Sequence, residues 1–192
     1  MFVAIEGIDG AGTTTQSKLV ADALRARKLS VHVTHEPSAR GIGKLIRAEL
    51  HGGTMPEAAM ALLFAADRLD HYHNEIGPAL SREEIVLSDR YVLSSLVYQG
   101  EALGGWPVQL NAHAPTPDLT VLIAVAPELA AQRRMTRGGA TERYDDSALQ
   151  SRLASRYDAL APSGTLRLDG SRPPAEICAA IVAAIVEKLT KA

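Results

Sequence analysis

The stretch that decides the fold is Phe2-Val-Ala-Ile-Glu6, which runs directly into Gly7-Ile-Asp-Gly-Ala-Gly12-Thr-Thr-Thr-Gln16. Residues 2–6 form an apolar run typical of a buried parallel strand, and the glycines and hydroxyl side chains after it are typical of a turn that opens a helix. Such a turn directs backbone N–H groups at an anion. The stretch therefore predicts a phosphate-binding loop over residues 7–14, with a glycine-rich turn that binds no ligand as the alternative.

One position departs from the phosphate-loop pattern of glycine, four residues, glycine, lysine, and serine or threonine. Gly7, Gly12 and Thr14 fit the pattern, but Thr13 occupies the lysine position. A hydrogen bond to a charged group contributes about 1.5–3 kcal/mol. Its uncompensated loss would slow phosphoryl transfer roughly tenfold to a few hundredfold. We expect another cation to act instead: Lys18 lies one helical turn along, but an arginine of a later polar connection is the better candidate.

Composition and charge narrow the class of protein. The chain has 192 residues, of which 46% are hydrophobic and 22% are charged, as in a globular domain rather than a disordered or membrane-spanning one. A formal net charge of −2 gives no sign of a surface for nucleic acid. The single cysteine, Cys178, cannot form an internal disulfide. We expect one domain over residues 1–192, located in the cytoplasm, without a leader or a membrane segment.

Strand patterns alternate with helix patterns along the chain. Strands are expected at residues 2–6, 30–34, 84–88, 119–125 and 165–168. Helices are expected at residues 14–28, 41–50, 56–76 and 92–98, and from Pro173 to Lys191. One further helix is expected to begin at Pro127 and another to end at about Ala161, and residues 104–117 are expected to form a loop. This order predicts an α/β fold of three layers, in which helices flank a five-stranded parallel sheet and ligands bind at the carboxyl ends of the strands.

Polar residues follow two of these strands. The second strand ends in His35-Glu36-Pro37 and the third in Asp89-Arg90-Tyr91. The polar connection after the fourth strand carries Arg137 and Arg143. Carboxylates near a phosphate loop suit magnesium or the phosphate acceptor, and arginines suit phosphate oxygens.

Eight segments occur in an order that resembles the thymidylate kinase family of nucleoside-monophosphate kinases. These segments are Glu6–Gly12, His35–Pro37, Ile42–Arg47, Leu62–Arg68, Asp89–Ser95, Tyr98–Gly100, Pro117–Thr120 and Glu142–Asp145. They span most of the chain, and the resemblance implies a phosphate-loop kinase fold with a short lid at about residues 134–146.

The resemblance also implies where the acceptor nucleotide dTMP binds. Phe64 would stack on thymine, with core packing as the alternative from spacing alone, and Arg68 would hydrogen-bond a thymine carbonyl from the same helix face. Arg90 would bind the monophosphate, Tyr98 and Gln99 would line the sugar and base, and Tyr144 would close over the substrate. The full set implied to bind dTMP is Glu36, Pro37, Phe64, Arg68, Arg90, Ser94, Ser95, Tyr98, Gln99 and Tyr144.

For the donor side, the resemblance implies ATP and Mg²⁺. The residues implied to bind ATP are Gly7, Ile8, Asp9, Gly10, Ala11, Gly12, Thr13, Thr14, Thr15 and Arg133. Thr14, Asp9 and Asp89 would hold the metal, and Asp9, Arg90, Arg137 and Arg143 would be catalytic. Because Gly10 follows Asp9 where some relatives carry an arginine, the lid would supply the arginine that stabilises the transferred phosphoryl group.

The expected activity is the transfer of the γ-phosphate of ATP to dTMP, giving dTDP for dTTP synthesis. Two alternatives remain at the level of sequence. One is a kinase that acts on another nucleoside or nucleoside monophosphate. The other is a nucleotide-binding module with little or no turnover, consistent with Thr13. The resemblance further implies a homodimer, and no nucleic acid or membrane partner is expected.

Overall fold

The computed structural model describes residues 1–138, 143–144 and 146–191. Of Arg137 it describes the backbone but not the side chain. Within these residues, a five-stranded parallel sheet has the strand order β2-β3-β1-β4-β5. The strands are β1 (Phe2–Glu6), β2 (Val31–His35), β3 (Ile85–Asp89), β4 (Leu119–Ala124) and β5 (Leu166–Asp169). The predicted α/β fold with a parallel sheet is confirmed.

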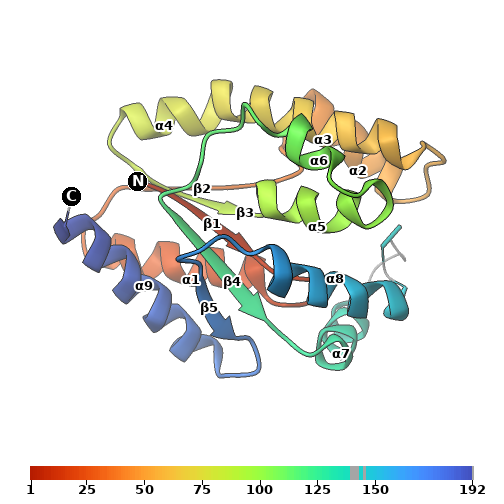
Figure 1. Cartoon of the computed structure of the whole chain (residues 1–192). Coiled ribbons are helices and arrows are strands. Elements are labelled where there is room, and N and C mark those ends of the chain that lie inside the picture. Colours follow the sequence, from red (N-terminus) through yellow and green to blue (C-terminus); the bar gives the residue numbers. More distant parts are fainter. Residues whose placement is uncertain (139–142, 145, 192) are drawn as a thin grey trace.

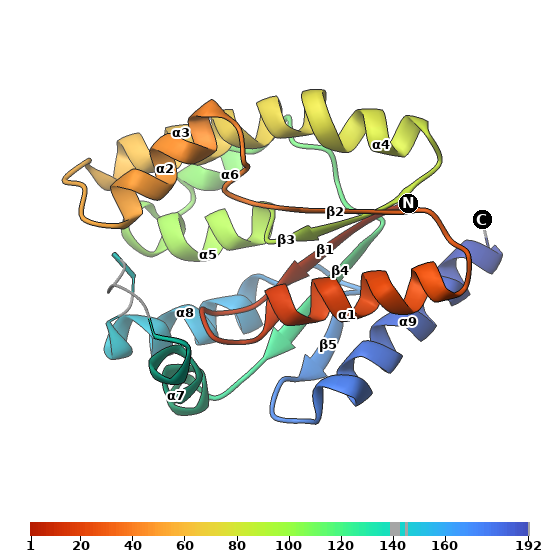
Figure 2. The same cartoon turned by 180° about the vertical axis from the view of Figure 1, so that it is seen from behind.

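Helices cover both faces of this sheet (Figures 1 and 2). Helices α1 and α9 lie on one face, and α3 and α4 lie on the other, together with α2 and α6. The helices are α1 (Thr13–Ala26), α2 (Gly41–Leu50), α3 (Glu57–His71), α4 (Gly77–Ser81), α5 (Val92–Leu103), α6 (Trp106–Leu110), α7 (Pro127–Arg137), α8 (Ser147–Leu160) and α9 (Pro174–Lys191). A π-helical turn, η1 (Tyr72–Ile76), joins α3 to α4.

The central strand β1 shows why its first four residues are apolar. All of its residues are buried. Val3 and Ile5 join a hydrophobic cluster with residues of α1 and α9, whereas Phe2 and Ala4 join a second cluster on the opposite face. Successive side chains of a strand point to opposite faces, so a strand covered on both sides favours apolar residues at successive positions, and here only the last residue, Glu6, is polar.

Two details differ from the predicted elements. Residues 104–117 were expected to form a loop, but Trp106–Leu110 forms the short helix α6. The predicted helix 56–76 contains the π-helical turn and continues as α4 to Ser81. Five residues are too few for a periodic pattern, and a π turn depends on tertiary packing more than on composition.

The sheet register places two polar segments at the same edge. Ile5 of β1 lies opposite Asp89 of β3, and His35 of β2 also lies opposite Asp89. The phosphate loop after β1 and the Asp89-Arg90-Tyr91 segment after β3 therefore start side by side. No helix of the described residues is long and apolar enough to cross a membrane.

Candidate active site

The glycine-rich loop leads into α1 in the conformation that the motif requires. Gly10 has φ +91° and Gly12 has φ +99°, backbone angles that favour glycine. Gly12 caps α1 without a side-chain hydrogen bond, and the first turn is closed by Gln16 N–H donating to the Gly12 carbonyl at 2.9 Å. The N–H groups at the start of α1 precede this bond, so they can face an anion.

Helix α7 packs directly against this loop. A Cβ atom on Gly10 would lie 2.4 Å from the carbonyl oxygen of Ala130, so only glycine allows the approach. Arg134 Nη1 donates to the Asp9 carbonyl at 2.6 Å, and Arg133 Nη1 donates to the Ala11 carbonyl at 3.4 Å. Two arginines of α7 thus contact the backbone of the phosphate loop.

The threonines of the loop have different environments. Thr13, at the lysine position, is only 6% exposed. Thr14 and Thr15 are exposed at the start of α1. Thr14 Oγ1 donates to Asp89 Oδ2 at 2.5 Å, and the buried Asp89 Oδ1 has no hydrogen-bond partner among the described residues. A hydroxyl and a carboxylate with an unused oxygen are hard ligands that suit Mg²⁺, so these two residues fit the metal.

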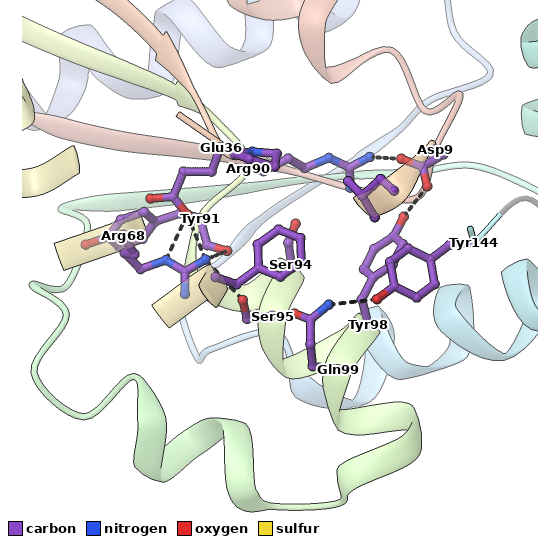
Figure 3. A pocket seen from close by; sticks show the side chains of 13 residues that line it. Asp9, Glu36, Arg68, Arg90, Tyr91, Ser94, Ser95, Tyr98, Gln99 and Tyr144 are labelled. Atoms are coloured by element: carbon purple, nitrogen blue, oxygen red, sulfur yellow. Dashed lines mark hydrogen bonds and ion pairs between the residues drawn. The ribbon is translucent and has the colours of Figure 1, made fainter. Parts of the chain in front are cut away.

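A cavity of about 140 Å³ lies beside the loop. Its walls come from the ends of β1, β2 and β3 and from α2, α3 and α5, with Tyr144 on a further side (Figure 3). Every residue expected to bind dTMP lines it, together with Asp9 and two residues that the sequence did not single out, Leu50 and Tyr91. The cavity thus gathers residues that are far apart in the chain.

Arg68 is held rigidly at one end of this pocket. Its side chain is 1% exposed and forms an ion pair with Glu36, at 2.7 Å between Nη2 and Oε2. Nη1 donates to Asn111 Oδ1, and Nη2 also donates to Ser95 Oγ at 3.1 Å and to the Tyr91 carbonyl at 3.2 Å. A buried charge requires such partners. Among the described residues, Nη1 donates to Asn111 alone, and since it carries two hydrogens, one N–H group remains for a ligand.

Glu36, the ion-pair partner of Arg68, is itself held in place by a buried histidine. Glu36 Oε1 lies 3.3 Å from His71 Nδ1, and His71 Nε2 lies 2.7 Å from Thr34 Oγ1. His71 is fully buried on α3, one turn after Arg68. The histidine therefore orients the carboxylate that orients the arginine.

Arg90 lies at the other end of the pocket, close to the phosphate loop (Figure 3). Its Nη2 donates to Asp9 Oδ1 at 2.7 Å and its Nη1 donates to Tyr157 Oη at 2.9 Å. Arg90 has φ +74°, a conformation rare outside glycine, so the backbone turns sharply to aim this side chain. Burial lowers the pKa of Arg90, but Tyr157, Tyr98, Asp9 and Asp89 raise it well above its usual value, so the group stays charged.

Asp9 links the phosphate loop to the walls of the pocket. Besides Arg90, its carboxylate accepts from Tyr98 Oη at 2.9 Å and from Gln150 Nε2 at 3.3 Å. Burial raises the pKa of Tyr98 well above its usual value, and Asp9 adds to the shift, so the hydroxyl is a hydrogen-bond donor at neutral pH. Because both oxygens of Asp9 are engaged, Thr14 and Asp89 fit a metal better than Asp9 does.

Tyr144 packs against the pocket from the segment between α7 and α8. Its ring meets Tyr98 edge to face at 5.3 Å between centroids, and its hydroxyl donates to Glu57 Oε1 at 2.6 Å. Gln99 Nε2 donates to the same hydroxyl at 3.4 Å. Burial, followed by the hydrogen bond to Glu57, raises the pKa of Tyr144. This tyrosine therefore lines one side of the pocket, and its closure over the substrate stays a prediction.

Of the two predicted lid arginines, Arg143 lies away from the glycine-rich loop. Arg143 donates to the Met55 carbonyl at 2.8 Å and pairs with Glu57 at 3.2 Å, which places it beside α3. Arg137 ends α7, and its side chain lies outside the described part of the chain, as do residues 139–142 and 145 of the predicted lid. Their catalytic roles stay predictions.

The sequence patterns did not predict several residues that contribute to the site. Asn111 follows α6 in the segment expected to be a loop, and Glu57, Gln150 and Tyr157 are isolated polar positions on helices. Among the described residues, the Oε1 atom of the buried Gln150 has no partner. Spacing could not reveal them, because they reach the site through long-range packing.

Taken together, the site has a glycine-rich loop after the first strand and, next to it, a polar pocket with the buried Arg68 at one end and the partly buried Arg90 at the other. This combination, at the carboxyl edge of a parallel sheet, defines a phosphate-loop kinase of small molecules. Comparison with known proteins identifies the kind.

A family model described as thymidylate kinase matches residues 5–181. A probable thymidylate kinase of Pyrobaculum aerophilum is 40% identical over 194 residues, covering 99% of this chain and 98% of the relative. Thymidylate kinases of Thermomicrobium roseum and Gluconobacter oxydans are 38% and 36% identical, each over 99% of this chain and 96% of the relative. The chain therefore belongs to the thymidylate kinase family, as the motifs predict.

Proposed function

We propose that this protein transfers the γ-phosphate of ATP to dTMP and forms dTDP. The observation that carries the proposal is the pocket beside the phosphate loop, which is lined by all ten side chains expected to bind dTMP. A pocket that only packed the core would not need the guanidinium groups of Arg68 and Arg90 at its two ends. The family membership over nearly the whole chain supports the same activity.

The acceptor nucleotide fits the pocket in one direction. Arg90 lies near the phosphate loop and would bind the monophosphate, because a guanidinium binds phosphate oxygens by a planar fork. Arg68 lies at the far end, where its remaining Nη1 N–H group would donate to a thymine carbonyl. Phe64 is half-buried and lines the pocket while packing against Ile46 and Met60, so it can present its ring to the base.

We propose that Thr14 and Asp89 hold Mg²⁺, which neutralises charge on the β- and γ-phosphates when it is bound. The amides of residues 10–15 would bind the donor phosphates. Asp9 holds Arg90 through its carboxylate and so orients the acceptor phosphate toward the loop. Arg133, between the Ala11 and Gly170 carbonyls, lies where it can contact the adenine side of ATP. For Arg137 and Arg143 we keep the catalytic role that the resemblance implies.

The two alternatives are less well supported. The residues predicted to bind dTMP all line one pocket beside the glycine-rich loop, which supports a kinase with an acceptor over a module that binds ATP or dTMP without turnover. A kinase that acts on another nucleotide would bind its base at the Arg68 end of the pocket. We propose that the remaining N–H group of Arg68 donates to a thymine carbonyl there, which a comparison of acceptor nucleotides tests. Neither alternative is favoured by the similarity to thymidylate kinases.

The experiment measures dTDP formation from dTMP, ATP and Mg²⁺, with dUMP, dCMP and dGMP as competing acceptors. Arg90→Ala is expected to lower kcat/KM for dTMP roughly a hundredfold or more, because it removes charge-assisted contacts to the acceptor phosphate. Arg82→Ala is the matched control, since Arg82 pairs with Glu84 on the surface; its kcat/KM should equal that of the wild type. Absence of dTDP formation by the wild type would contradict the proposal.

We also propose that the protein is a homodimer that works in the cytoplasm, without nucleic acid or membrane partners. Exposed leucines on neighbouring helices support the dimer: Leu45 of α2 is 45% exposed, and Leu62 and Leu69 of α3 are 50% and 42% exposed. Leu62 and Leu69 are seven residues apart, so they share one face of α3. The organisation as a single domain likewise remains our proposal.

A further inference from the structure

Arg68 has a guanidinium group that is anchored mainly at one oxygen atom. Its Nε donates to Glu36 Oε2 at 2.8 Å, and its Nη2 lies 2.7 Å from the same oxygen. Ser95 Oγ and the Tyr91 carbonyl accept from Nη2 as well, at 3.1 Å and 3.2 Å. All of these contacts engage Nε and Nη2. The direction of Nη1, the nitrogen that we expect to reach the base, therefore depends on another partner.

That partner is Asn111, which directly follows α6. Arg68 Nη1 donates to Asn111 Oδ1 across 43 residues of the chain. Asn111 is 8% exposed, and among the described residues it does not belong to those that line the acceptor pocket. Its side chain is thus placed to act on a bound base through Arg68 rather than by touching the base itself.

The amide group of Asn111 is fixed in the orientation that Arg68 requires. Its Nδ2 donates to the Pro107 carbonyl at 2.8 Å, and its backbone N–H donates to the same carbonyl at 3.1 Å. Because arginine offers only donors, the amide oxygen must face Arg68 and the amide nitrogen must face an acceptor. Pro107 is buried, and α6 packs against α3, the helix that carries Arg68. The oxygen that receives Nη1 is therefore held by a packed element.

The direction of the acceptor pocket decides which carbonyl group of the base Nη1 would meet. Arg90 lies at the end near the phosphate loop and Arg68 at the other end (Figure 3). A nucleotide with its phosphate at Arg90 would present to Arg68 the edge of the base farthest from the sugar. In thymine and uracil this edge carries the 4-carbonyl group, which accepts, whereas in cytosine it carries an amino group, which donates. A fixed N–H donor accepts the first kind of base and rejects the second.

We propose that Asn111 is a positioning residue that aims the free N–H group of Arg68 at the 4-carbonyl group, and thereby sets a preference for thymine and uracil over cytosine. This inference rests on the proposed function and deepens it, because it assigns the base preference of that site to a residue outside the pocket. The rival explanation is that Asn111 only stabilises the end of α6 through the Pro107 carbonyl. Different atoms of the amide serve the two roles, so substitutions can separate them.

The test compares Asn111→Leu with Asn111→Asp. Both lose the side-chain donor to the Pro107 carbonyl, but Asn111→Asp keeps an oxygen for Arg68. Asn111→Leu is expected to raise the KM for dTMP roughly tenfold or more. The ratio of kcat/KM for dTMP to kcat/KM for dCMP should fall by a similar factor, because dCMP never makes the contact that is lost. Asn111→Asp should lose clearly less on both measures, and the KM for ATP should stay within about twofold in both variants.

Gln109→Leu is the matched control, since Gln109 is an exposed amide side chain on α6. It should leave both KM values and the ratio between the acceptors within about twofold of the wild type, as expected for a surface position. Circular dichroism and thermal unfolding report whether each variant is folded. If Asn111→Leu does not fold, Asn111→Ala, which also lacks the oxygen, takes its place in the comparison.

The inference is overturned if Asn111→Leu lowers kcat/KM for dTMP and dCMP by the same factor, or if Asn111→Asp is impaired as strongly as Asn111→Leu. Wild-type kinetics in Asn111→Leu, or a wild type without preference for dTMP over dCMP, also overturn it. A wild type that binds dTMP but forms no dTDP contradicts the proposed function alone. Calorimetric dissociation constants of dTMP and dCMP then replace kcat/KM in the same comparison. A wild type that binds no dTMP contradicts both.

Discussion

Glu6 ends β1 with a fully buried carboxyl group next to the acceptor pocket. Ser94 Oγ donates to its Oε2 at 2.6 Å, and among the described residues its Oε1 has no partner. Burial raises the pKa of Glu6 from 4.5 to about 6, against the lowering effects of Ser94 and Arg90. The folded protein therefore binds the Glu6 proton more tightly than the unfolded chain does.

This pKa shift predicts a pH-dependent stability. Because the folded state retains the proton between pH 4.5 and about 6, the free energy of unfolding falls as the pH rises through that range. A shift of this size corresponds to about 2 kcal/mol. Glu6→Gln should remove this loss, so the difference between variant and wild type should grow by about that amount from acidic to neutral pH. Urea unfolding at several pH values measures it.

The control for this prediction is Glu176→Gln, on the exposed surface of α9. Its unfolding free energy should follow the wild type at every pH. If the Glu6→Gln and wild-type curves are parallel, the carboxyl group of Glu6 does not titrate abnormally and the prediction fails.

At the scale of elements, the contact between the phosphate loop and α7 decides where two arginines lie. Gly10→Ala would place a Cβ 2.4 Å from the Ala130 carbonyl oxygen, at φ +91°. Helix α7 must then move away from the loop, and small displacements of binding groups are costly. We expect Gly10→Ala to raise the KM for ATP roughly tenfold or more, measured by steady-state kinetics at saturating dTMP.

Gly164→Ala separates the clash from backbone strain. Gly164 has a similar φ, +84°, but a Cβ atom added there would have no atom within 4 Å. Gly164→Ala should lower the free energy of unfolding by about 1–2 kcal/mol, because an L residue at positive φ is strained, and Gly10→Ala should lower it further because of its clash. Only Gly10→Ala should change the KM for ATP. Equal kinetics in the two variants would show that α7 does not depend on this contact.

At the scale of the whole molecule, the exposed leucines of α2 and α3 predict how two copies associate. Light scattering after size exclusion should give twice the 20.4 kDa of one chain. Leu62→Arg with Leu69→Arg should shift the mass to one chain, because burying an unpaired charge at an apolar interface is unfavourable. Leu160→Arg, at a similarly exposed leucine of α8, is the control and should leave the dimer intact. A monomeric wild type would refute the dimer.

The resemblance to a family implied the ten residues of the acceptor pocket, whereas the sequence by itself determined the order of strands and helices and a glycine-rich loop after the first strand. Each of these is a local pattern: apolar runs mark buried strands, glycines mark a turn, and polar residues after strands mark the carboxyl edge. Element ends differed by one or a few residues, since hydrogen bonding at a terminus depends on neighbours.

Only the tertiary structure decided which groups hold these residues in place. Asn111 and His71 fix Arg68 and Glu36 across long separations in sequence, and Tyr157 reaches Arg90 from α8. The structure also brought Arg134 to the loop and placed Arg143 beside α3. Such contacts depend on how packed helices bring distant positions together, and no local pattern encodes them. The physical reason is that a buried charge requires a partner, but burial does not specify where in the chain that partner lies.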